Sequence, residues 1–206
     1  MVNLASDKEL EVKFFASDLG ALAKRVLALG GSLVQERTHE YNLRFDNRKG
    51  DLSEAMSMLR LRRDSGNRIT FKGPSETLGG VLARTEIEFD VSDFAAAQKL
   101  IEALGYRSNF VYEKYRTTYD IEGLKITLDE MPYGNFIEIE GPDAESIHSM
   151  AERMQLDWEE RLPETYISIF RRLKELAKLG FTDLTFENFK DHEVNMARVG
   201  VKPADN

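Results

Sequence analysis

A strict alternation of charged and apolar residues recurs in short segments along this chain. The segment 9–13, Glu-Leu-Glu-Val-Lys, shows the pattern most plainly. In a β-strand, residues two positions apart point to the same side, so such a segment has one charged face and one apolar face. The alternation therefore predicts strands rather than helices. The pattern recurs at residues 60–62, 68–72, 86–88, 114–116, 125–129 and 138–140.

The charged faces of these strands differ from an ordinary solvent-exposed sheet face. Such a face mixes charged residues with serine, threonine, glutamine and asparagine, and a single charged strand needs no other explanation. Here Glu, Asp, Lys or Arg fills nearly every position of the charged parity in seven segments. We therefore predict an α+β fold, in which a closed antiparallel β-barrel has a charged lumen and is covered by helices on its apolar outer side.

The predicted lumen holds acids and bases together. The acids are Glu9, Glu11, Glu86, Glu88, Asp129, Glu138 and Glu140, and the bases are Lys13, Arg60, Arg62, Lys72, Lys114 and Arg116. Removing water from so many charges is costly, so the lumen should be wet and should bind a ligand. Carboxylates without cysteine or histidine suit hard cations such as Mg²⁺ or Mn²⁺, and lysine and arginine suit phosphate oxygens. This combination predicts a site for a metal–polyphosphate complex.

Helices are predicted between the strands. Ser17-Asp18 follows one strand and Ser92-Asp93 follows another, and each pair should cap a helix with a regular apolar face. A third strand–helix unit begins at residue 135, and a last helix lies within residues 163–180. Loops are expected at residues 47–55 and 74–80. We predict a single domain over residues 1–180, followed by a C-terminal extension, 181–206, whose polar end is disordered.

Composition limits the partners and the chemistry. The net charge of −8 argues against a general nucleic-acid binder, which would carry a basic surface. The absence of cysteine excludes disulfides, thiol nucleophiles and iron–sulfur clusters, and it fits a reducing compartment. No apolar leader or membrane-length run is found, so we expect a cytoplasmic protein without a membrane partner.

The acidic pattern at residues 9–13 resembles the N-terminal ExExK signature of the CYTH domain family, the triphosphate tunnel metalloenzymes. This group includes class IV adenylyl cyclases, thiamine-triphosphatases and inorganic tripolyphosphatases. The resemblance spans about residues 7–175. Further segments occur in the family's order, namely Leu59-Arg60-Leu61-Arg62, Thr70-Phe71-Lys72-Gly73-Pro74, Thr85-Glu86-Ile87-Glu88, Lys114-Tyr115-Arg116, Leu128-Asp129 and Phe136-Ile137-Glu138-Ile139-Glu140.

The resemblance implies a role for each lumen residue, with Mg²⁺ or Mn²⁺ as cofactor. The implied metal ligands are Glu9, Glu11, Glu138 and Glu140, with contributions from Asp129, Glu86 and Glu88. The implied triphosphate-binding residues are Lys13, Arg60, Arg62, Lys72, Lys114 and Arg116. The implied catalytic residues are Glu9, Glu11, Lys13, Glu138 and Glu140.

Two positions depart from the pattern of many family members. An Asp-x-Asp pair is common where this chain has Thr127-Leu128-Asp129, which shortens the expected metal set by one ligand. A lysine is common just before the aromatic residue of the last helix, where this chain has Glu164-Thr165-Tyr166. One expected contact at the substrate end is therefore missing.

The resemblance leaves three functions open for a small triphosphate such as ATP, tripolyphosphate or thiamine triphosphate. Residues 70–74 and 136–141 look most like the class IV cyclase branch, which converts ATP to cyclic AMP and pyrophosphate. A hydrolase of the tripolyphosphatase or thiamine-triphosphatase type could use the same lumen with water as the attacking group. A non-catalytic polyphosphate- or nucleotide-binding module is disfavoured, because a pure anion binder gains nothing from inward carboxylates.

Overall fold

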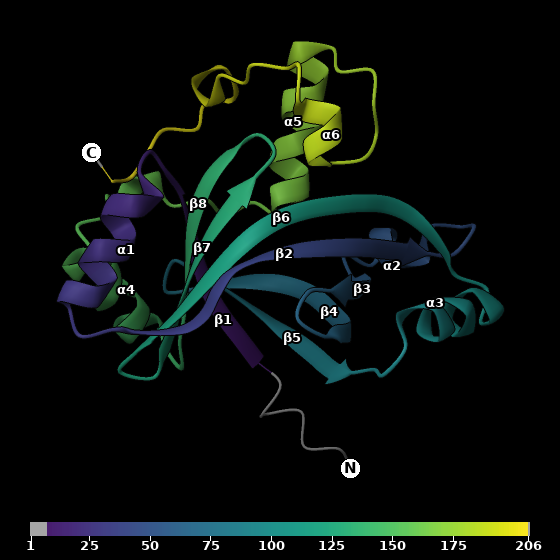
Figure 1. The fold of residues 1–206 in the computed structure, drawn as a ribbon, viewed down its shortest axis with the longest axis horizontal. Coiled ribbons are helices and arrows are strands. Elements are labelled where there is room, and N and C mark those ends of the chain that lie inside the picture. Colours follow the sequence, from purple (N-terminus) through teal and green to yellow (C-terminus); the bar gives the residue numbers. More distant parts are fainter. Residues whose placement is uncertain (1–7, 206) are drawn as a thin grey trace.

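In the computed structural model, which describes residues 8–205, eight antiparallel strands form a closed β-barrel, as the alternation predicts (Figure 1). The order around the barrel is β1-β5-β4-β3-β2-β6-β7-β8, and β8 pairs back onto β1. Closure leaves no free sheet edge. The strands are β1 (Lys8–Ala16), β2 (Ser32–Asp46), β3 (Met58–Arg63), β4 (Asn67–Leu78), β5 (Val81–Asp90), β6 (Arg107–Ile121), β7 (Leu124–Met131) and β8 (Gly134–Glu140).

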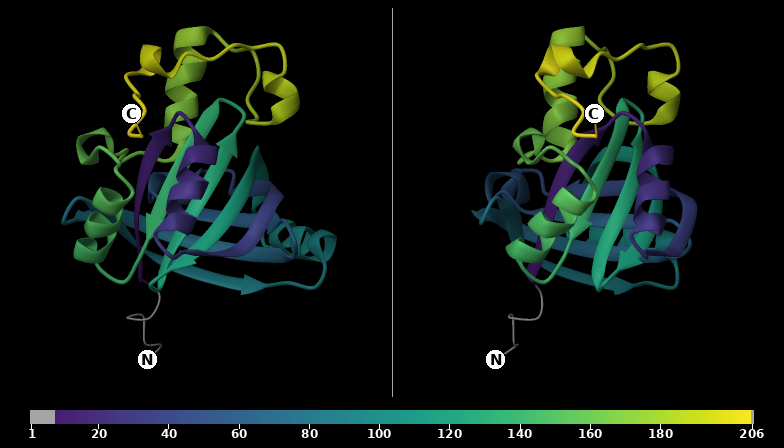
Figure 2. Two further views of the ribbon diagram at one scale, coloured as in Figure 1. Left: turned by 60° about the vertical axis from the view of Figure 1, so that its left-hand side comes forward. Right: turned by 90° about the vertical axis from the view of Figure 1, so that its left-hand side faces the viewer.

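Helices cover the outside of the barrel and one of its ends. The helices α1 and α4 lie over β1 and β8, α3 lies at the opposite side, and α5 stands at one end (Figures 1 and 2). No helix in the described part of the chain is long and apolar enough to cross a bilayer. The helices are α1 (Leu19–Ala28), α2 (Asp51–Glu54), α3 (Phe94–Ala103), α4 (Ala144–Arg153), α5 (Tyr166–Ala177) and α6 (Phe186–Phe189).

The largest hydrophobic cluster lies between the barrel wall and the helices α1 and α4, outside the lumen. Val12 and Phe14 of β1 and Ile139 of β8 are almost fully buried, and they belong to one cluster with Leu22 of α1 and Ile147 of α4. Burial of a side chain of this size stabilises a fold by about 1.5–3 kcal/mol. In β1 and β8 the apolar parity therefore packs against the helices, and the charged parity faces inward.

The predicted helix starts are confirmed. The carboxylates of Asp18, Asp93 and Asp143 accept hydrogen bonds from backbone N–H groups at the starts of α1, α3 and α4. Replacing such a cap by alanine typically costs about 1 kcal/mol. The predicted loop at residues 74–80 is wrong, because β4 continues to Leu78 after a bulge, and only Gly79-Gly80 forms the turn.

The C-terminal segment is packed where the sequence predicts disorder. The Ala204 N–H donates to the Phe15 carbonyl oxygen at 2.9 Å, and the Asp205 carboxylate accepts from the backbone N–H groups of Ser17 and Asp18. Val201 and Ala204 are buried. Apolar residues in this segment are spaced too irregularly to produce a helical or strand period, so their contribution is visible only in the fold. Residues 1–7, at the start of the predicted domain, and residue 206, at the end of the predicted extension, lie outside the described residues.

Candidate functional site

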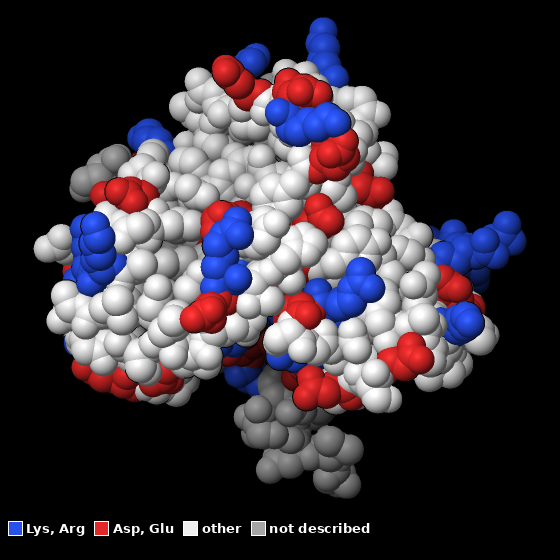
Figure 3. Space-filling view, viewed as in Figure 1, with Lys and Arg blue, Asp and Glu red and all other residues white. Residues whose placement is uncertain are grey.

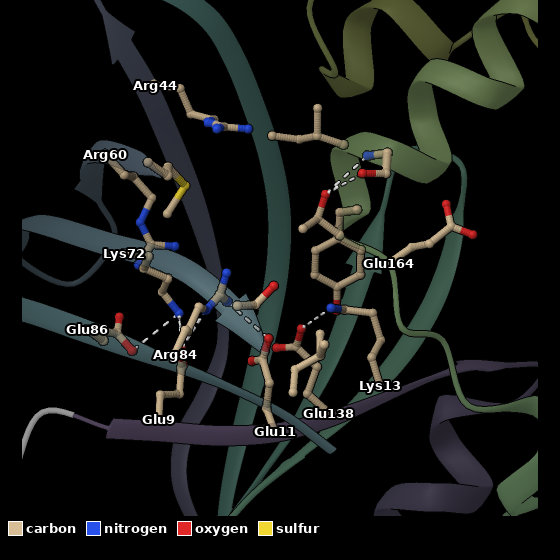
Figure 4. Close-up of a pocket in the computed structure, with 18 of the residues that line it drawn as sticks. Glu9, Glu11, Lys13, Arg44, Arg60, Lys72, Arg84, Glu86, Glu138 and Glu164 are labelled. Atoms are coloured by element: carbon tan, nitrogen blue, oxygen red, sulfur yellow. Dashed lines mark hydrogen bonds and ion pairs between the residues drawn. The ribbon is translucent and has the colours of Figure 1, made fainter. Parts of the chain in front are cut away.

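The barrel contains a cavity of about 910 Å³, at the upper end of the range for small-molecule pockets (Figure 4). Among the described residues, its lining includes eleven lysines and arginines and seven glutamates. This local excess of positive charge stands against a net charge of −8 for the whole chain. On the face seen in Figure 3, by contrast, acidic and basic side chains are interspersed. A pocket of this kind attracts small anions that the rest of the protein would repel.

Strand pairing across the closure of the barrel gathers the predicted site residues. Twelve of the thirteen predicted residues line the cavity, although their chemical roles stay predictions. In the register of β1 and β8, Glu11 lies opposite Glu140, and Lys13 lies opposite Glu138. The twelve are Glu9, Glu11, Lys13, Arg60, Arg62, Lys72, Glu86, Glu88, Lys114, Arg116, Glu138 and Glu140.

The thirteenth residue, Asp129, lies behind the lining and is fully buried. Its carboxylate accepts hydrogen bonds from Lys114 Nζ at 3.0 Å, from Arg116 Nε at 2.6 Å and from the Tyr166 hydroxyl at 2.7 Å. The ring of Tyr166 also lies under Lys13, whose Nζ is 4.3 Å from the ring centroid. In this structure Asp129 therefore positions cavity bases and the start of α5.

Glu9 and Glu86 share one lysine at the β1–β5 side of the cavity. Lys72 Nζ lies 2.6 Å from Glu9 and 3.2 Å from Glu86, and Arg84 Nε lies 3.1 Å from Glu9. Burial by itself would raise the pKa of Glu9, but Lys72 and Arg84 outweigh it and lower that pKa. Burial, together with the neighbouring Glu9, raises the pKa of Glu86 to about 7 despite Lys72. The two carboxyl groups therefore differ in charge near neutral pH.

Glu138 is the centre of a second cluster, formed by β1, β6 and β8. Lys13 Nζ lies 2.9 Å from Glu138, and Arg116 donates to its other oxygen. Burial would raise the pKa of Glu138, but Lys13, Arg116 and Lys114 together lower it well below its usual value. Glu138 is therefore a carboxylate at neutral pH, and its charge is held by three bases.

Several charged lining or near-lining residues were missing from the sequence prediction, among them Arg84, Glu40 and Arg44. Arg84 bridges the acids of β1, with Nη2 at 3.0 Å from Glu11. Glu40 lies within 4 Å of three bases of the cavity wall, and Arg44 lines the cavity near α5. A signal existed for each of them, because Arg84 shares its parity with the predicted acids of β5, and residues 40, 42 and 44 alternate with apolar neighbours.

Glu40 is 1% exposed and holds bases of two strands, β3 and β6, in place. Its carboxylate lies 3.4 Å from Arg62, 3.6 Å from Lys114 and 3.9 Å from Arg116. Burial would raise the pKa of Glu40, but these three bases and Arg60 lower it to about 2. Ionised Glu40 therefore stabilises the folded chain.

We expect Glu40→Gln to flatten the dependence of unfolding free energy on acid pH. A carboxyl group with a lowered folded pKa contributes its full stability above its unfolded pKa, here about 4.5, and loses it as the pH falls toward about 2. By about pH 3, the wild type should have lost on the order of 2 kcal/mol that the variant never had. Denaturant unfolding across this range measures the difference. Parallel pH curves for the two proteins would show that Glu40 is not held as a carboxylate.

The carboxylates of the cavity suit a hard divalent cation by their chemistry, since all their donors are oxygens. Among residues 8–205, however, no three acidic or histidine residues are arranged as a ready metal site. The carboxylates point instead to bases, as Glu11 does to Arg84 and Glu140 does to Lys125. The cavity therefore fits a divalent cation only after an exchange of partners. Glu9, Glu11, Glu138 and Glu140 would then hold the cation, and the bases that they release would bind phosphate.

Comparison with known proteins agrees with this geometry. The family model described as the CYTH domain matches residues 7–172. No curated protein sequence matches the chain. The fold is similar to that of a candidate adenylate cyclase from Vibrio parahaemolyticus, with a TM-score of 0.72 and 20% identity over 79% of this chain and 97% of the other.

Two further solved structures share the fold. The protein PH1012 from Pyrococcus horikoshii has a TM-score of 0.65 and 24% identity, over 78% of this chain and 98% of the other. A candidate adenylyl cyclase from Hippeastrum, described as having a dominant triphosphatase activity, has a TM-score of 0.60 and 19% identity, over 79% and 95%. At these identities the likeness concerns the fold.

Proposed function

This chain belongs to the CYTH domain family, and from that premise we propose that it is a divalent-metal-dependent enzyme acting on a triphosphate. The observation that supports this best is the pairing of inward carboxylates with inward bases in one cavity, as between Lys13 and Glu138 or between Lys72 and Glu9. A cavity that bound anions alone would need the bases only. The acids give the same cavity a place for cations.

Substrate binding would exchange the partners of both sets of residues. The bases Lys13, Arg60, Arg62, Lys72, Lys114 and Arg116 would leave carboxylates for phosphate oxygens and would neutralise charge that develops on the phosphates during transfer. Glu9, Glu11, Glu138 and Glu140 would hold Mg²⁺ or Mn²⁺, which polarises a phosphoryl group and activates the attacking oxygen when bound. Both exchanges conserve charge pairing inside the cavity, so neither leaves a desolvated ion alone.

For the reaction itself we propose the class IV adenylyl cyclase type. The ribose 3′-hydroxyl of ATP attacks the α-phosphorus, the bond to the β-phosphate oxygen breaks, and pyrophosphate leaves. The second candidate is a tripolyphosphatase or thiamine-triphosphatase, in which water attacks the terminal phosphorus. The Hippeastrum neighbour, with its triphosphatase activity, favours keeping this alternative. We propose a cytoplasmic location for the protein, which agrees with the absence of cysteine from its sequence.

Product analysis tests this proposal. The protein is incubated with ATP, tripolyphosphate or thiamine triphosphate, with Mg²⁺ or Mn²⁺ and with or without EDTA, and cyclic AMP, pyrophosphate and orthophosphate are separated. We expect cyclic AMP and pyrophosphate in equal amounts from ATP, and none with EDTA. Orthophosphate without cyclic AMP would replace the cyclase by the hydrolase. Binding without turnover of any substrate would overturn the enzyme and leave a binding module.

A further inference from the structure

Two arginines of the cavity differ from all its other bases. Arg44 of β2 and Arg171 of α5 line the cavity, yet within residues 8–205 neither side chain has an ion pair or a hydrogen bond. The other nine bases of the lining each pair with a carboxylate. The nine are Lys8, Lys13, Arg60, Arg62, Lys72, Arg84, Lys114, Lys125 and Arg116.

The acid closest in influence to Arg44 is already engaged elsewhere. Asp46 acts on Arg44 electrostatically, but its carboxylate accepts hydrogen bonds from the backbone N–H groups of Asn47, Leu52 and Ser53 and from the Ser53 hydroxyl. Asp46 therefore holds the turn that follows β2. It leaves the guanidinium of Arg44 without a direct counter-ion.

Repulsion between arginines increases this imbalance. Arg44 lies directly opposite Arg60 in the pairing of β2 and β3, and like charges in that position destabilise a sheet. Burial lowers the pKa of Arg44, and Arg171 and Arg60 lower it further, while Tyr112 and Asp46 act in the opposite direction. An anion placed between Arg44 and Arg171 would remove this repulsion, so the folded protein gains most from a ligand that brings negative charge there.

The place of Arg44 and Arg171 in the cavity shows where they lie relative to the predicted triphosphate-binding residues. In Figure 4, Arg44 and Arg60 lie at the opposite end of the cavity from Glu9 and Glu11. Arg171 of α5 acts on Arg44 electrostatically, so it belongs to the same end. Side chains directly opposite one another on paired strands start only about 5 Å apart. A phosphate chain bound to Arg60 would therefore need one further anionic group at that end to meet Arg44.

We propose that Arg44 and Arg171 form a subsite for an additional phosphate, beyond the three held by the predicted triphosphate residues. The ligand class is a triphosphate extended by one more phosphate at this end, either as a longer linear polyphosphate or as a nucleoside triphosphate phosphorylated on its ribose. The inference rests on the proposed function, because the fourth phosphate is located relative to the triphosphate.

Titration calorimetry with Mg²⁺, in the cold to slow turnover, tests the subsite on the full chain. The ligands are tripolyphosphate, linear tetraphosphate, ATP and ATP carrying a ribose 3′-phosphate. For at least one extended ligand, the wild type should bind at least about fivefold more tightly than its three-phosphate counterpart, as a charge-assisted contact allows. The variant Arg44→Gln/Arg171→Gln should lose this advantage and keep tripolyphosphate affinity within about twofold. Tighter binding of tetraphosphate than of tripolyphosphate would identify a longer polyphosphate as the ligand. Tighter binding of the 3′-phosphorylated ATP than of ATP would identify a ribose-phosphorylated nucleotide.

Two matched variants accompany the test. Arg44→Lys/Arg171→Lys restores the charge and should recover part of the advantage, which a fold defect would not. Arg153→Gln, at an exposed arginine paired with Glu122 outside the cavity, should behave as wild type. Equal affinity of the wild type for extended and three-phosphate ligands would overturn the subsite, as would an unchanged preference in the double glutamine variant. Equal loss of both ligand types would instead place Arg44 and Arg171 in the triphosphate site. Failure of the wild type to bind tripolyphosphate would overturn the proposed function itself.

Discussion

Replacement of Glu138 or Glu9 by glutamine should lower turnover by more than about tenfold, equivalent to about 1.4 kcal/mol in the activation barrier. Each substitution removes one negative oxygen from the predicted cation-binding set and keeps the size of the side chain. Glu138 also loses its ion pair with Lys13, at 2.9 Å, and Glu9 loses its pair with Lys72, at 2.6 Å. Initial rates with ATP and with tripolyphosphate, at saturating Mg²⁺ and Mn²⁺, measure the effect.

These variants should remain folded, because the largest hydrophobic cluster lies outside the lumen, but loss of a buried ion pair should lower their melting temperature. Circular dichroism and melting curves check this. Glu122→Gln is a matched control, since Glu122 is exposed and pairs with Arg153 away from the cavity. If either the Glu138 or the Glu9 variant kept the wild-type rate at saturating metal, the assignment of that residue to the metal would be wrong.

Arg60→Ala and Arg62→Ala should each weaken binding of tripolyphosphate strongly. Both side chains are nearly buried in the cavity wall, where a charge-assisted contact is worth roughly 1.5–3 kcal/mol, or about 10- to 150-fold in affinity. In the present structure Arg60 pairs with Glu88 at 3.3 Å, and Arg62 pairs with Glu40 at 3.4 Å. Titration with tripolyphosphate and Mg²⁺ measures the loss.

The control for these arginines has to lie away from the cavity. Arg172 of α5 is unsuitable, because it pairs at 2.7 Å with Glu164, which lines the cavity. Arg153→Ala is better matched, as the exposed partner of Glu122. Similar losses of affinity in the Arg60, Arg62 and Arg153 variants would mean that phosphate is attracted by the overall charge and not by a defined lumen.

The fold was predictable because charged and apolar residues alternate along the strands, so each strand's two faces can be read from its own residues. Residues 9–13 and 136–140 alternate so regularly that both the strand and the side facing the helices follow from local spacing alone. The same local rule would have found Arg84 and Arg44, which share the charged parity of their strands. They were missed because the predicted lumen took only the acids of residues 86–88 from β5 and no residue from β2.

Which charges meet was not predictable from local spacing. Glu9 reaches Lys72 and Arg84 only because β1 closes the barrel between β5 and β8, a neighbourhood that the chain order does not reveal. Tyr166 reaches Asp129 because α5 sits at one end of the barrel. The packing of Ala204 against β1 likewise depends on the return of the chain across the finished barrel.

The melting temperature with Mg²⁺ and tripolyphosphate, compared with Mg²⁺ and orthophosphate, tests most directly whether one lumen binds metal and triphosphate together. A ligand at 100 times its dissociation constant stabilises the folded chain by about 2.7 kcal/mol. For a domain of this size, each kcal/mol raises the melting temperature by about 2–4 °C. We therefore predict a rise of roughly 5–10 °C with tripolyphosphate. The rise with orthophosphate should be clearly smaller, because that ion is too short to contact both Lys13 and Arg60. Identical melting curves under the two conditions would contradict the existence of such a lumen.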